Sequence, residues 1–272
     1  MLEIQKEKFQ PIIKWSGSKR SQAHIILSYF GEFNNYYEPF IGGGSILYAL
    51  NPSSGIAGDV NKPLIDLWNE VKNNPEKLAD EYEVRWSKLQ EKGHLYYYEV
   101  RDRFNQNGSP YDLLFLSRTC VNGLIRYNKE GQFNNSLHHS RPGINPNTLR
   151  KIIKQWSVRI SNAEFVYGDY RDTTKNAKAG DLIYLDPPYF ATKGRYFGTI
   201  DYNEFIEYLY DLKKRNIRYI LSYDGTREDK SYIVDIPKDL YSKHILLESG
   251  NSTFRKVIDK KVEKVHESLY IS

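Results

Sequence analysis

Residues 181–189 read Asp-Leu-Ile-Tyr-Leu-Asp-Pro-Pro-Tyr, and this stretch indicates both the fold class and its functional edge. The apolar run from Leu182 to Leu185 predicts a strand that is buried on both faces of a sheet. The run stops at Asp186, and Pro187 and Pro188 can neither continue a helix nor pair in a ladder. Such a strand presents a carboxylate at the carboxyl edge of the sheet, where open α/β sheets bind ligands.

The same residues suit chemistry on the exocyclic amine of a nucleobase. This amine is a poor nucleophile because its lone pair is delocalised into the ring, and two acceptors on its hydrogens would localise that pair. The Asp186 carboxylate is one acceptor and the Pro187 carbonyl is the other, since Pro188 keeps the preceding backbone extended. Tyr189 offers a flat face on which a base can stack. Alone, the motif fits a plain strand-to-loop corner equally well, so the interpretation depends on what precedes it.

The composition limits the class of protein. The 272 residues suffice for one large domain or one domain with a sizeable insert. The single cysteine, Cys120, argues against a disulfide framework and favours a reducing compartment. No apolar run is long enough for a membrane span, and the N-terminal residues lack the apolar core of a signal peptide. We therefore expect a cytoplasmic protein with no membrane partner.

Positive charge is concentrated in the middle of the sequence. The net charge of the chain is +5, whereas residues 113–160 alone carry eight Lys or Arg and one acid, which gives 8 − 1 = +7. The remainder therefore carries 5 − 7 = −2. This distribution favours a polyanionic partner for the central segment.

Two glycine-containing segments precede the motif. Residues 41–45 read Ile-Gly-Gly-Gly-Ser and lie between a short strand that ends at Glu38 and a predicted helix, which suits close backbone approach to a ligand. They match neither the dinucleotide fingerprint nor a P-loop. Residues 16–18 read Ser-Gly-Ser before a helix expected over 22–30, where exposed N–H groups favour a polar ligand. Lys19 can pair with a carboxylate there, and Trp15 can cover an adenine ring.

A second predicted strand, residues 56–61, ends in an acid. Asp59 occupies the position that holds ribose hydroxyls in nucleotide-binding α/β folds. Asn61 can contribute to such a site or cap the next helix, and the sequence favours neither role.

Residues 63–118 are predicted to be helical, over 64–71, 77–90, 94–104 and 111–118. Residues 124–127 and 132–134 flank Asn-Lys-Glu-Gly, which predicts a β-hairpin rich in side chains that read base edges and phosphates. His138 and His139 lack the neighbouring ligands of a metal site. A helix capped by Asn147 follows.

Further strands are expected over 164–167, 217–222, 242–247 and 267–271, with a helix over 201–215. Because strands alternate with helices, we expect a largely parallel sheet.

Four motifs stand in a fixed order: Lys-Trp-Ser-Gly-Ser-Lys at 14–19, Glu-Pro-Phe-Ile-Gly-Gly-Gly-Ser at 38–45, Gly-Asp-Val-Asn at 58–61 and Asp-Pro-Pro-Tyr at 186–189. Before the last motif come Asn-Gly-Leu-Ile-Arg-Tyr-Asn at 122–128 and Gly-Gln-Phe-Asn at 131–134. Over nearly its whole length the chain resembles the Dam-type DNA adenine-N6 methyltransferases, which are site-specific enzymes. Asp-Pro-Pro-Tyr alone occurs in many methyltransferases, whereas the ordered set is specific.

The resemblance implies an α/β, Rossmann-like methyltransferase fold with a mixed seven-stranded sheet whose last strand is inserted antiparallel. It implies a catalytic domain from residues 1–62 and 161–272, and a helical DNA-recognition insert over 63–160 with a hairpin near 122–136. It further implies S-adenosylmethionine as methyl donor, double-stranded DNA as substrate, base flipping and no metal. We expect a monomer. The sequence is equally compatible with a role beside a cognate restriction endonuclease, a role in a phage and a housekeeping role.

The residues themselves, together with the positions that match the family motifs, give the expected residue roles. The catalytic motif is Asp186, Pro187, Pro188 and Tyr189. The residues expected to bind the cofactor are Trp15, Lys19, Glu38, Pro39, Phe40, Gly42, Gly44, Asp59, Asn61, Asp169 and Asp186. The residues expected to contact DNA are Lys14, Arg118, Asn122, Arg126, Tyr127, Asn128, Lys129 and Arg141. The sequence departs from the best-known members in the loop 190–199 and after Asn134, and both regions touch DNA in the family, so a GATC specificity cannot be carried over.

Other functions remain to be weighed. A cytosine-N4 methyltransferase usually has Ser, and a protein glutamine methyltransferase Asn, at the position of Asp186. Cytosine-C5 chemistry needs a Pro-Cys nucleophile, whereas Cys120 follows Thr119. An RNA adenine-N6 methyltransferase stays open, because a stacking pocket does not distinguish sugars. A non-catalytic DNA-binding module is disfavoured because every motif is intact.

Overall fold

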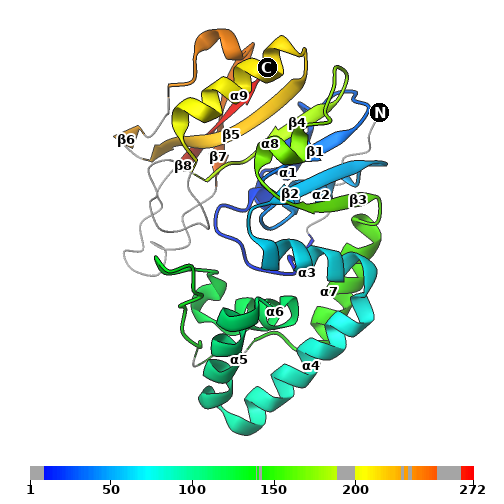
Figure 1. The fold of residues 1–272 in the computed structure, drawn as a ribbon, viewed down its shortest axis with the longest axis vertical. Helices are drawn as coiled ribbons and strands as arrows, with labels where there is room; N and C mark the ends of the chain where they lie inside the picture. The colour runs from blue at the N-terminus through cyan, green and yellow to red at the C-terminus, as the bar shows by residue number, and fades with distance from the viewer. Residues whose placement is uncertain are drawn as a thin grey trace.

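A mixed β-sheet and a group of helices form the two halves of the molecule (Figure 1). The computed structural model describes residues 9–138, 140, 143–188, 200–227, 230–231, 235–249 and 265–272. The strands are β1 (Tyr36–Glu38), β2 (Gly55–Asp59), β3 (Ala163–Tyr167), β4 (Leu182–Leu185), β5 (Arg218–Arg227), β6 (Lys230–Ser231), β7 (Lys243–Ser249) and β8 (Val265–Ile271). Their order is β3-β2-β1-β4-β5-β8-β7, with the short β6 paired to β5 outside this path.

The pairing confirms the fold class. β3, β2, β1, β4 and β5 pair in parallel, whereas β8 lies between β5 and β7 and is antiparallel to both. β1 and β4 are adjacent in the sheet, with Tyr37 and Ile183 in register. From this pair the strands continue in opposite directions, β2 and β3 beyond β1 and β5 beyond β4, so the strand order reverses here. This switch point is where α/β sheets bind ligands, so the ends of β1, β2, β3 and β4 meet at the expected edge.

Both faces of β4 are covered, as its apolar run predicted. Leu182 and Tyr184 belong to one hydrophobic cluster, and Ile183 and Leu185 belong to a second cluster on the other side. Alternate residues of a strand point to opposite faces, so the whole strand is buried. Helix α9 (Tyr202–Lys214) covers the second face with Phe205, Leu209 and Leu212.

The predicted helices are present near their expected positions, with two corrections at their ends, whereas the short helix at Tyr170–Thr174 was not predicted. They are α1 (Ala23–Leu27), α2 (Ser45–Leu50), α3 (Lys62–Asn73), α4 (Pro75–Lys92), α5 (His94–Asn107), α6 (Pro110–Thr119), α7 (Pro146–Arg159) and α8 (Tyr170–Thr174), with 3₁₀ turns η1 (Lys19–Ser21), η2 (Val121–Gly123) and η3 (Lys238–Leu240). The helix expected over 22–30 is shorter and is preceded by η1. The cap of α7 is Asn145, not Asn147: its side chain accepts from the backbone N–H of Asn147 and Thr148, because Pro146 occupies the first helical position.

Two strand predictions also need correction. The hairpin near 122–136 has no paired strands among its described residues, only isolated bridges between Cys120 and Leu137 and between Tyr127 and Phe133. The chain nevertheless folds back at the predicted turn, where Asn128 donates its N–H to the Gln132 carbonyl. In addition, β5 does not end at Ser222 but continues through a bulge between Asp224 and Thr226 to Arg227, because β8 pairs along its length.

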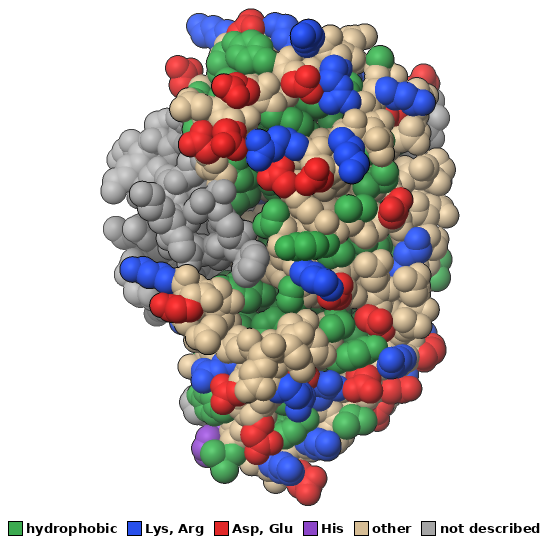
Figure 2. All heavy atoms as spheres, viewed as in Figure 1, with side chains coloured by type: hydrophobic (Ala, Val, Ile, Leu, Met, Phe, Trp, Pro, Cys, Tyr) green, Lys and Arg blue, Asp and Glu red, His purple; other side chains and the backbone are tan. Residues whose placement is uncertain are grey.

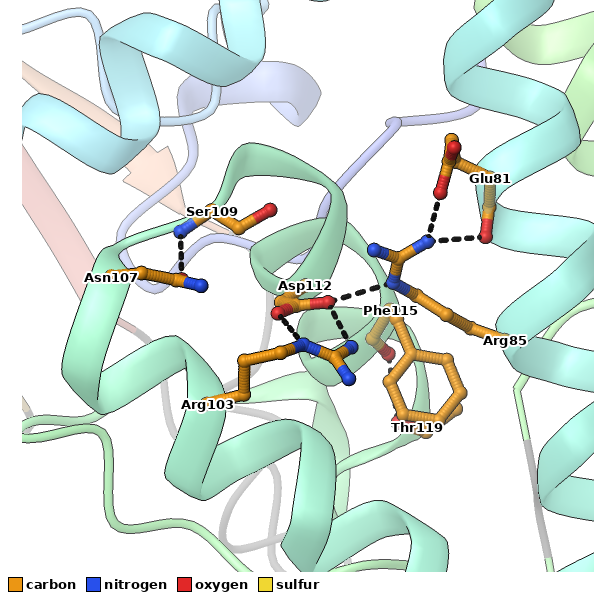
Figure 3. A network of polar contacts seen from close by, with 8 residues as sticks. All are labelled: Glu81, Arg85, Arg103, Asn107, Ser109, Asp112, Phe115 and Thr119. Carbon is orange, nitrogen blue, oxygen red and sulfur yellow. Dashed lines mark hydrogen bonds and ion pairs between the residues drawn. The ribbon is translucent and has the colours of Figure 1, made fainter.

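A buried carboxylate ties the lower helices together (Figure 3). Asp112 of α6 is 0% exposed, and it accepts hydrogen bonds from Arg85 Nε of α4 and Arg103 Nε of α5, each at 2.7 Å. Arg103 Nη2 adds a bond of 2.6 Å, so the second contact is bidentate. Charge-assisted bonds of this geometry hold three helices in one arrangement.

Candidate functional site

A cavity of about 370 Å³ opens at the carboxyl edge of the sheet. Its walls come from segments far apart in sequence, around residues 15–19, 38–46, 59–61, 167–170 and 184–188. Most of the expected cofactor and catalytic residues line it, namely Trp15, Lys19, Glu38, Phe40, Gly42, Gly44, Asp59, Asn61, Asp169, Asp186, Pro187 and Pro188. Pro39 is buried beside them, and Tyr189 lies outside the described residues.

The glycine turn after β1 forms the floor of the cavity. Gly42 and Gly44 have φ of 44° and 64°, a region that favours glycine. A Cβ added at Gly42 would lie 2.4 Å from Trp15 Nε1, so the turn also needs glycine for space. The Gly42 carbonyl accepts a hydrogen bond of 3.1 Å from Trp68 Nε1 of α3, which fixes the turn from beneath.

Asp59 is held at the end of β2 by the backbone. Its carboxylate accepts hydrogen bonds from the N–H of Asn61 at 2.9 Å and of Gly42 at 3.3 Å. Burial raises the pKa of Asp59 to about 6, although these bonds oppose the shift. Both bonds leave lone pairs of the carboxylate available, so Asp59 can still accept from ligand hydroxyls.

Asn61 has the capping role that the sequence left open. Its side chain accepts from the N–H of Leu64 at the start of α3. Its Nδ2 donates to the hydroxyl of Tyr127 at 3.1 Å, and both residues line the cavity. Tyr127, expected to contact DNA, is therefore part of the cavity wall.

A buried lysine is hydrogen-bonded to Asp186, the acid expected to be catalytic. Lys19 is 3% exposed, and its Nζ donates to Asp186 Oδ1 at 2.7 Å and to the Gly17 carbonyl at 3.0 Å. Burial raises the pKa of Asp186 to about 6 against the lowering influence of Lys19. Glu267 of β8 lies 3.7 Å from the same Nζ. The sequence did not point to Glu267, since a single acid in a predicted closing strand gives no sign of which distant side chain it contacts.

Glu38 faces the cavity as a second, deeper acid. It is 2% exposed and accepts a hydrogen bond of 2.8 Å from the Tyr36 hydroxyl. Burial, with a further contribution from the Asp186 charge, raises the pKa of Glu38 to about 8. The carboxyl is thus largely protonated at neutral pH, and a cation entering the cavity would favour its ionised form.

Asp169 and Tyr170 close the far side of the cavity. Asp169 caps α8, and its Oδ1 accepts from the backbone N–H and the Nε of Arg171. Tyr170 is 4% exposed, and its buried hydroxyl has no hydrogen-bond partner among the described residues. A buried orphan hydroxyl that lines a cavity can serve a ligand. Sequence reasoning passed over Tyr170, although it follows an acid at the end of a strand.

The residues expected to contact DNA divide into two groups. Lys14, Asn122, Arg126 and Lys129 are exposed, and Asn128 is half-buried and shapes the turn by bonding Gln132. Arg118 instead points inward: its guanidinium donates to the Pro11 carbonyl, and burial lowers its pKa to about 10. Arg141 lies outside the described residues.

The central positive charge is partly neutralised inside the fold. Arg150 contacts Glu76, Asp80 and Glu83 of α4, and Lys154 contacts Glu76. Figure 2 shows basic and acidic side chains interspersed over one face of the molecule. A charge count along the sequence overstates the positive charge available to a polyanion, because it does not include the acidic partners that lie on another helix.

Two features are absent from the part of the chain that the structure describes. No group of three or more His, Cys, Asp or Glu side chains there could hold a metal ion. No helix in the described part of the chain is long and apolar enough to cross a membrane.

Comparisons with known proteins place the chain in a family. The family model for D12 class N6 adenine-specific DNA methyltransferases matches residues 15–254. The type II methyltransferase M.MjaIII of Methanocaldococcus jannaschii is 30% identical over 85% of this chain and 88% of its own length. The type II methyltransferase M1.LlaDCHI of Lactococcus lactis subsp. cremoris is 30% identical over 70% of this chain and 69% of its own. A DNA adenine methylase of Serratia marcescens is 30% identical over 67% and 68%. With the fold and the strand-end acids already in place, this chain belongs to the D12 class of N6 adenine-specific DNA methyltransferases.

Proposed function

We propose that this protein transfers a methyl group from S-adenosylmethionine to N6 of an adenine that is flipped out of a specific duplex DNA sequence. The observation that carries the proposal is the position of Asp186, Pro187 and Pro188 in one cavity with Asp59 and the glycine turn. A base acceptor and a nucleoside-binding acid thereby face the same space.

The cavity residues fit the methyl donor. When bound, S-adenosylmethionine supplies a methyl group on a positively charged sulfur. Asp59 would accept hydrogen bonds from the ribose hydroxyls, and the backbone of the turn at 42–44, which lines the cavity, would lie against the methionine part. Glu38 would receive the ammonium group, which favours ionisation of a carboxyl that is largely protonated in the free protein.

Asp186 and the Pro187 carbonyl would receive the target amine. The adenine must leave the stack, because its amine cannot reach a protein-bound methyl group inside the duplex. Two acceptors on the N6 hydrogens direct the nitrogen lone pair toward the methyl carbon. The donor would supply the methyl group and keep the C–S electrons on its sulfur as the new N–C bond forms, and the Asp186 carboxylate would accept the N6 proton or pass it to water. Positioning and aligned acceptors supply the acceleration. The stacking role of Tyr189 stays a prediction.

The recognition segment 120–137 supports a duplex DNA substrate. Arg126 and Lys129 are exposed around the turn, and Lys14 packs its stem against Gly123 below it. Guanidinium, amide and ammonium groups in such an arrangement suit base edges and phosphates. We propose that Lys14 contacts phosphate and that Asn122, Arg126 and Asn128 read bases, with the protein acting as a monomer.

The test is methyl transfer with identification of the product. Labelled S-adenosylmethionine is supplied with unmethylated bacterial DNA or with RNA, and the modified base and its sequence context are determined. We expect N6-methyladenine in DNA within one short context. Asp186→Ala should lose transfer. It should also lose stability, because the buried Lys19 ammonium loses its close anionic partner, so transfer and donor binding are measured at a temperature where the variant is folded. Asp66→Ala, on the exposed face of α3, should behave as wild type. Label in RNA alone, or an active Asp186→Ala protein, would contradict the proposal.

A further inference from the structure

Lys19 lies between two carboxylates that come from different strands. Its Nζ is hydrogen-bonded to Asp186 Oδ1 at 2.7 Å, just after β4, and lies 3.7 Å from Glu267 Oε2 in β8. The exposed fractions of the three side chains are 3% for Lys19, 21% for Asp186 and 16% for Glu267. Glu267 Oε2 is buried and accepts no hydrogen bond from any described residue. Among the described residues, the ammonium therefore has Asp186 as a close anionic partner and Glu267 within reach.

This arrangement weakens Asp186 as an acceptor for as long as Lys19 stays in place. Under the proposed function Asp186 must accept from the adenine amine, and the Lys19 ammonium bonded to Oδ1 draws negative charge away from the carboxylate. The methyl donor also brings a sulfonium, a second positive charge, into the same cavity. Like charges repel strongly where water is scarce, so a sulfonium beside Asp186 would favour a position of Lys19 farther from it.

The second partner is close enough to receive it. A charge-assisted N–H···O bond has a length of about 2.8 Å, so a shift of roughly 1 Å would bring Nζ into contact with Glu267. The lysine stem has several rotatable bonds and can make this shift without backbone movement. A buried ammonium that left Asp186 without a new anionic partner would be strongly unfavourable.

We propose that Glu267 is a positioning residue for the methyl transfer: it receives Lys19 when the methyl donor enters and so frees Asp186 for the adenine amine. This inference rests on the proposed function. Glu267 touches neither methyl group nor base, and it acts only through Lys19. The titratable and charged groups that face Asp186 are Tyr36 and Glu38 from β1, Tyr184 from β4, Lys19 from η1 and Glu267 from β8.

The direct test follows the Lys19 amine by NMR. Protein with ¹⁵N-labelled lysine is titrated with S-adenosylmethionine in the absence of DNA, and the Lys19 signal is assigned by its loss in Lys19→Gln. We expect the donor to shift this signal in wild type and in Glu267→Asp, which keeps the charge, but not in Glu267→Gln. Glu248→Gln, on the exposed surface of the neighbouring β7, is the matched control and should behave as wild type.

Kinetics supply the second readout. Glu267→Gln should lower kcat by roughly tenfold or more with KM for the donor within about twofold, and Glu267→Asp should restore part of the rate. The acid limb of the kcat/KM profile should move to lower pH in Glu267→Gln, because the Glu267 charge raises the pKa of Asp186.

The two proposals can fail separately. An unshifted Lys19 signal in donor-bound wild type, or Glu267→Gln with the kcat and pH profile of Glu248→Gln, would overturn the role of Glu267 while leaving the methyl transfer intact. Wild-type protein that binds the donor but methylates no adenine in DNA would overturn the proposed function, and the inference that rests on it.

Discussion

The hydroxyl of Tyr127 accepts a hydrogen bond of 3.1 Å from Asn61 Nδ2, and this bond joins the proposed recognition segment to the cavity at the sheet edge. Asn61 in turn donates its backbone N–H to Asp59, and Tyr127 packs edge to face on Phe133 across the folded-back chain. The side chain of Asn105 in α5 accepts a hydrogen bond from the backbone N–H of Phe133 and donates one to the Phe133 carbonyl. A continuous set of contacts therefore runs from the proposed ribose acid to the proposed DNA-reading turn.

Tyr127→Phe should weaken this connection without emptying the space that the ring fills. Asn61 is 1% exposed, so its amide would lose a partner where water cannot readily replace it. We expect a loss of about 1–3 kcal/mol in the free energy of unfolding and a several-fold weaker affinity for S-adenosylmethionine. Urea denaturation and calorimetric titration measure the two effects. Tyr98→Phe, a half-buried tyrosine of α5, is the control, and equal behaviour of both variants would show that the bond has no such role.

Gly42→Ala should damage the cofactor site through two separate effects. The φ of 44° is unfavourable for alanine, and the new Cβ would meet the Trp15 indole at 2.4 Å. Gly31→Ala is a matched control, because Gly31 also has a positive φ, of 60°, but its nearest neighbour is an Arg218 nitrogen at 3.4 Å. We expect Gly31→Ala to cost about 1 kcal/mol of stability with unchanged donor affinity, whereas Gly42→Ala loses affinity by tenfold or more. Similar donor affinities for the two variants would refute the role of the indole contact.

Asp112→Asn should destabilise the helical part of the molecule. The substitution leaves Arg85 and Arg103 facing a neutral amide that cannot accept both side chains through charge-assisted bonds. Removing one partner of a buried ion pair costs about 3–5 kcal/mol, and we expect a loss of that order in urea unfolding. Asp66→Asn, which breaks an exposed pair with Lys62, should change stability by less than about 0.5 kcal/mol. A small loss for Asp112→Asn would mean that water or another group replaces the carboxylate.

The stability of the free protein should fall as Glu38 ionises. Burial raises the folded-state pKa of Glu38 from 4.5 to about 8, so its contribution is fully present below pH 4.5 and is lost as the pH rises through about 8. Glu38→Gln cannot ionise and still offers an oxygen to Tyr36. Between pH 5 and 9 the wild type should therefore lose roughly 4 kcal/mol of unfolding free energy relative to Glu38→Gln. Parallel pH profiles for the two proteins would contradict the raised pKa.

Local sequence determined the elements and the kind of site. The apolar run at 182–185, the glycine turn at 42–44 and the acids at 38, 59, 169 and 186 predicted strands that end in carboxylates at one edge. Hydrophobic periodicity and turn-forming residues act over a few neighbouring positions, so both can be recognised in the sequence alone. The ordered motifs gave the family, and the family-model match confirmed it.

Tertiary structure decided which distant side chains meet. Lys19 and Glu267 become neighbours only because β8 inserts beside β5, which in turn pairs with β4 before Asp186. Arg118 turns inward to the Pro11 carbonyl, and Arg150 finds the acids of α4. Partners of this kind depend on packing and solvent exclusion across the whole fold. Charge counts and spacing along one chain record neither of these, which is why they assigned Arg118 to DNA and missed Glu267.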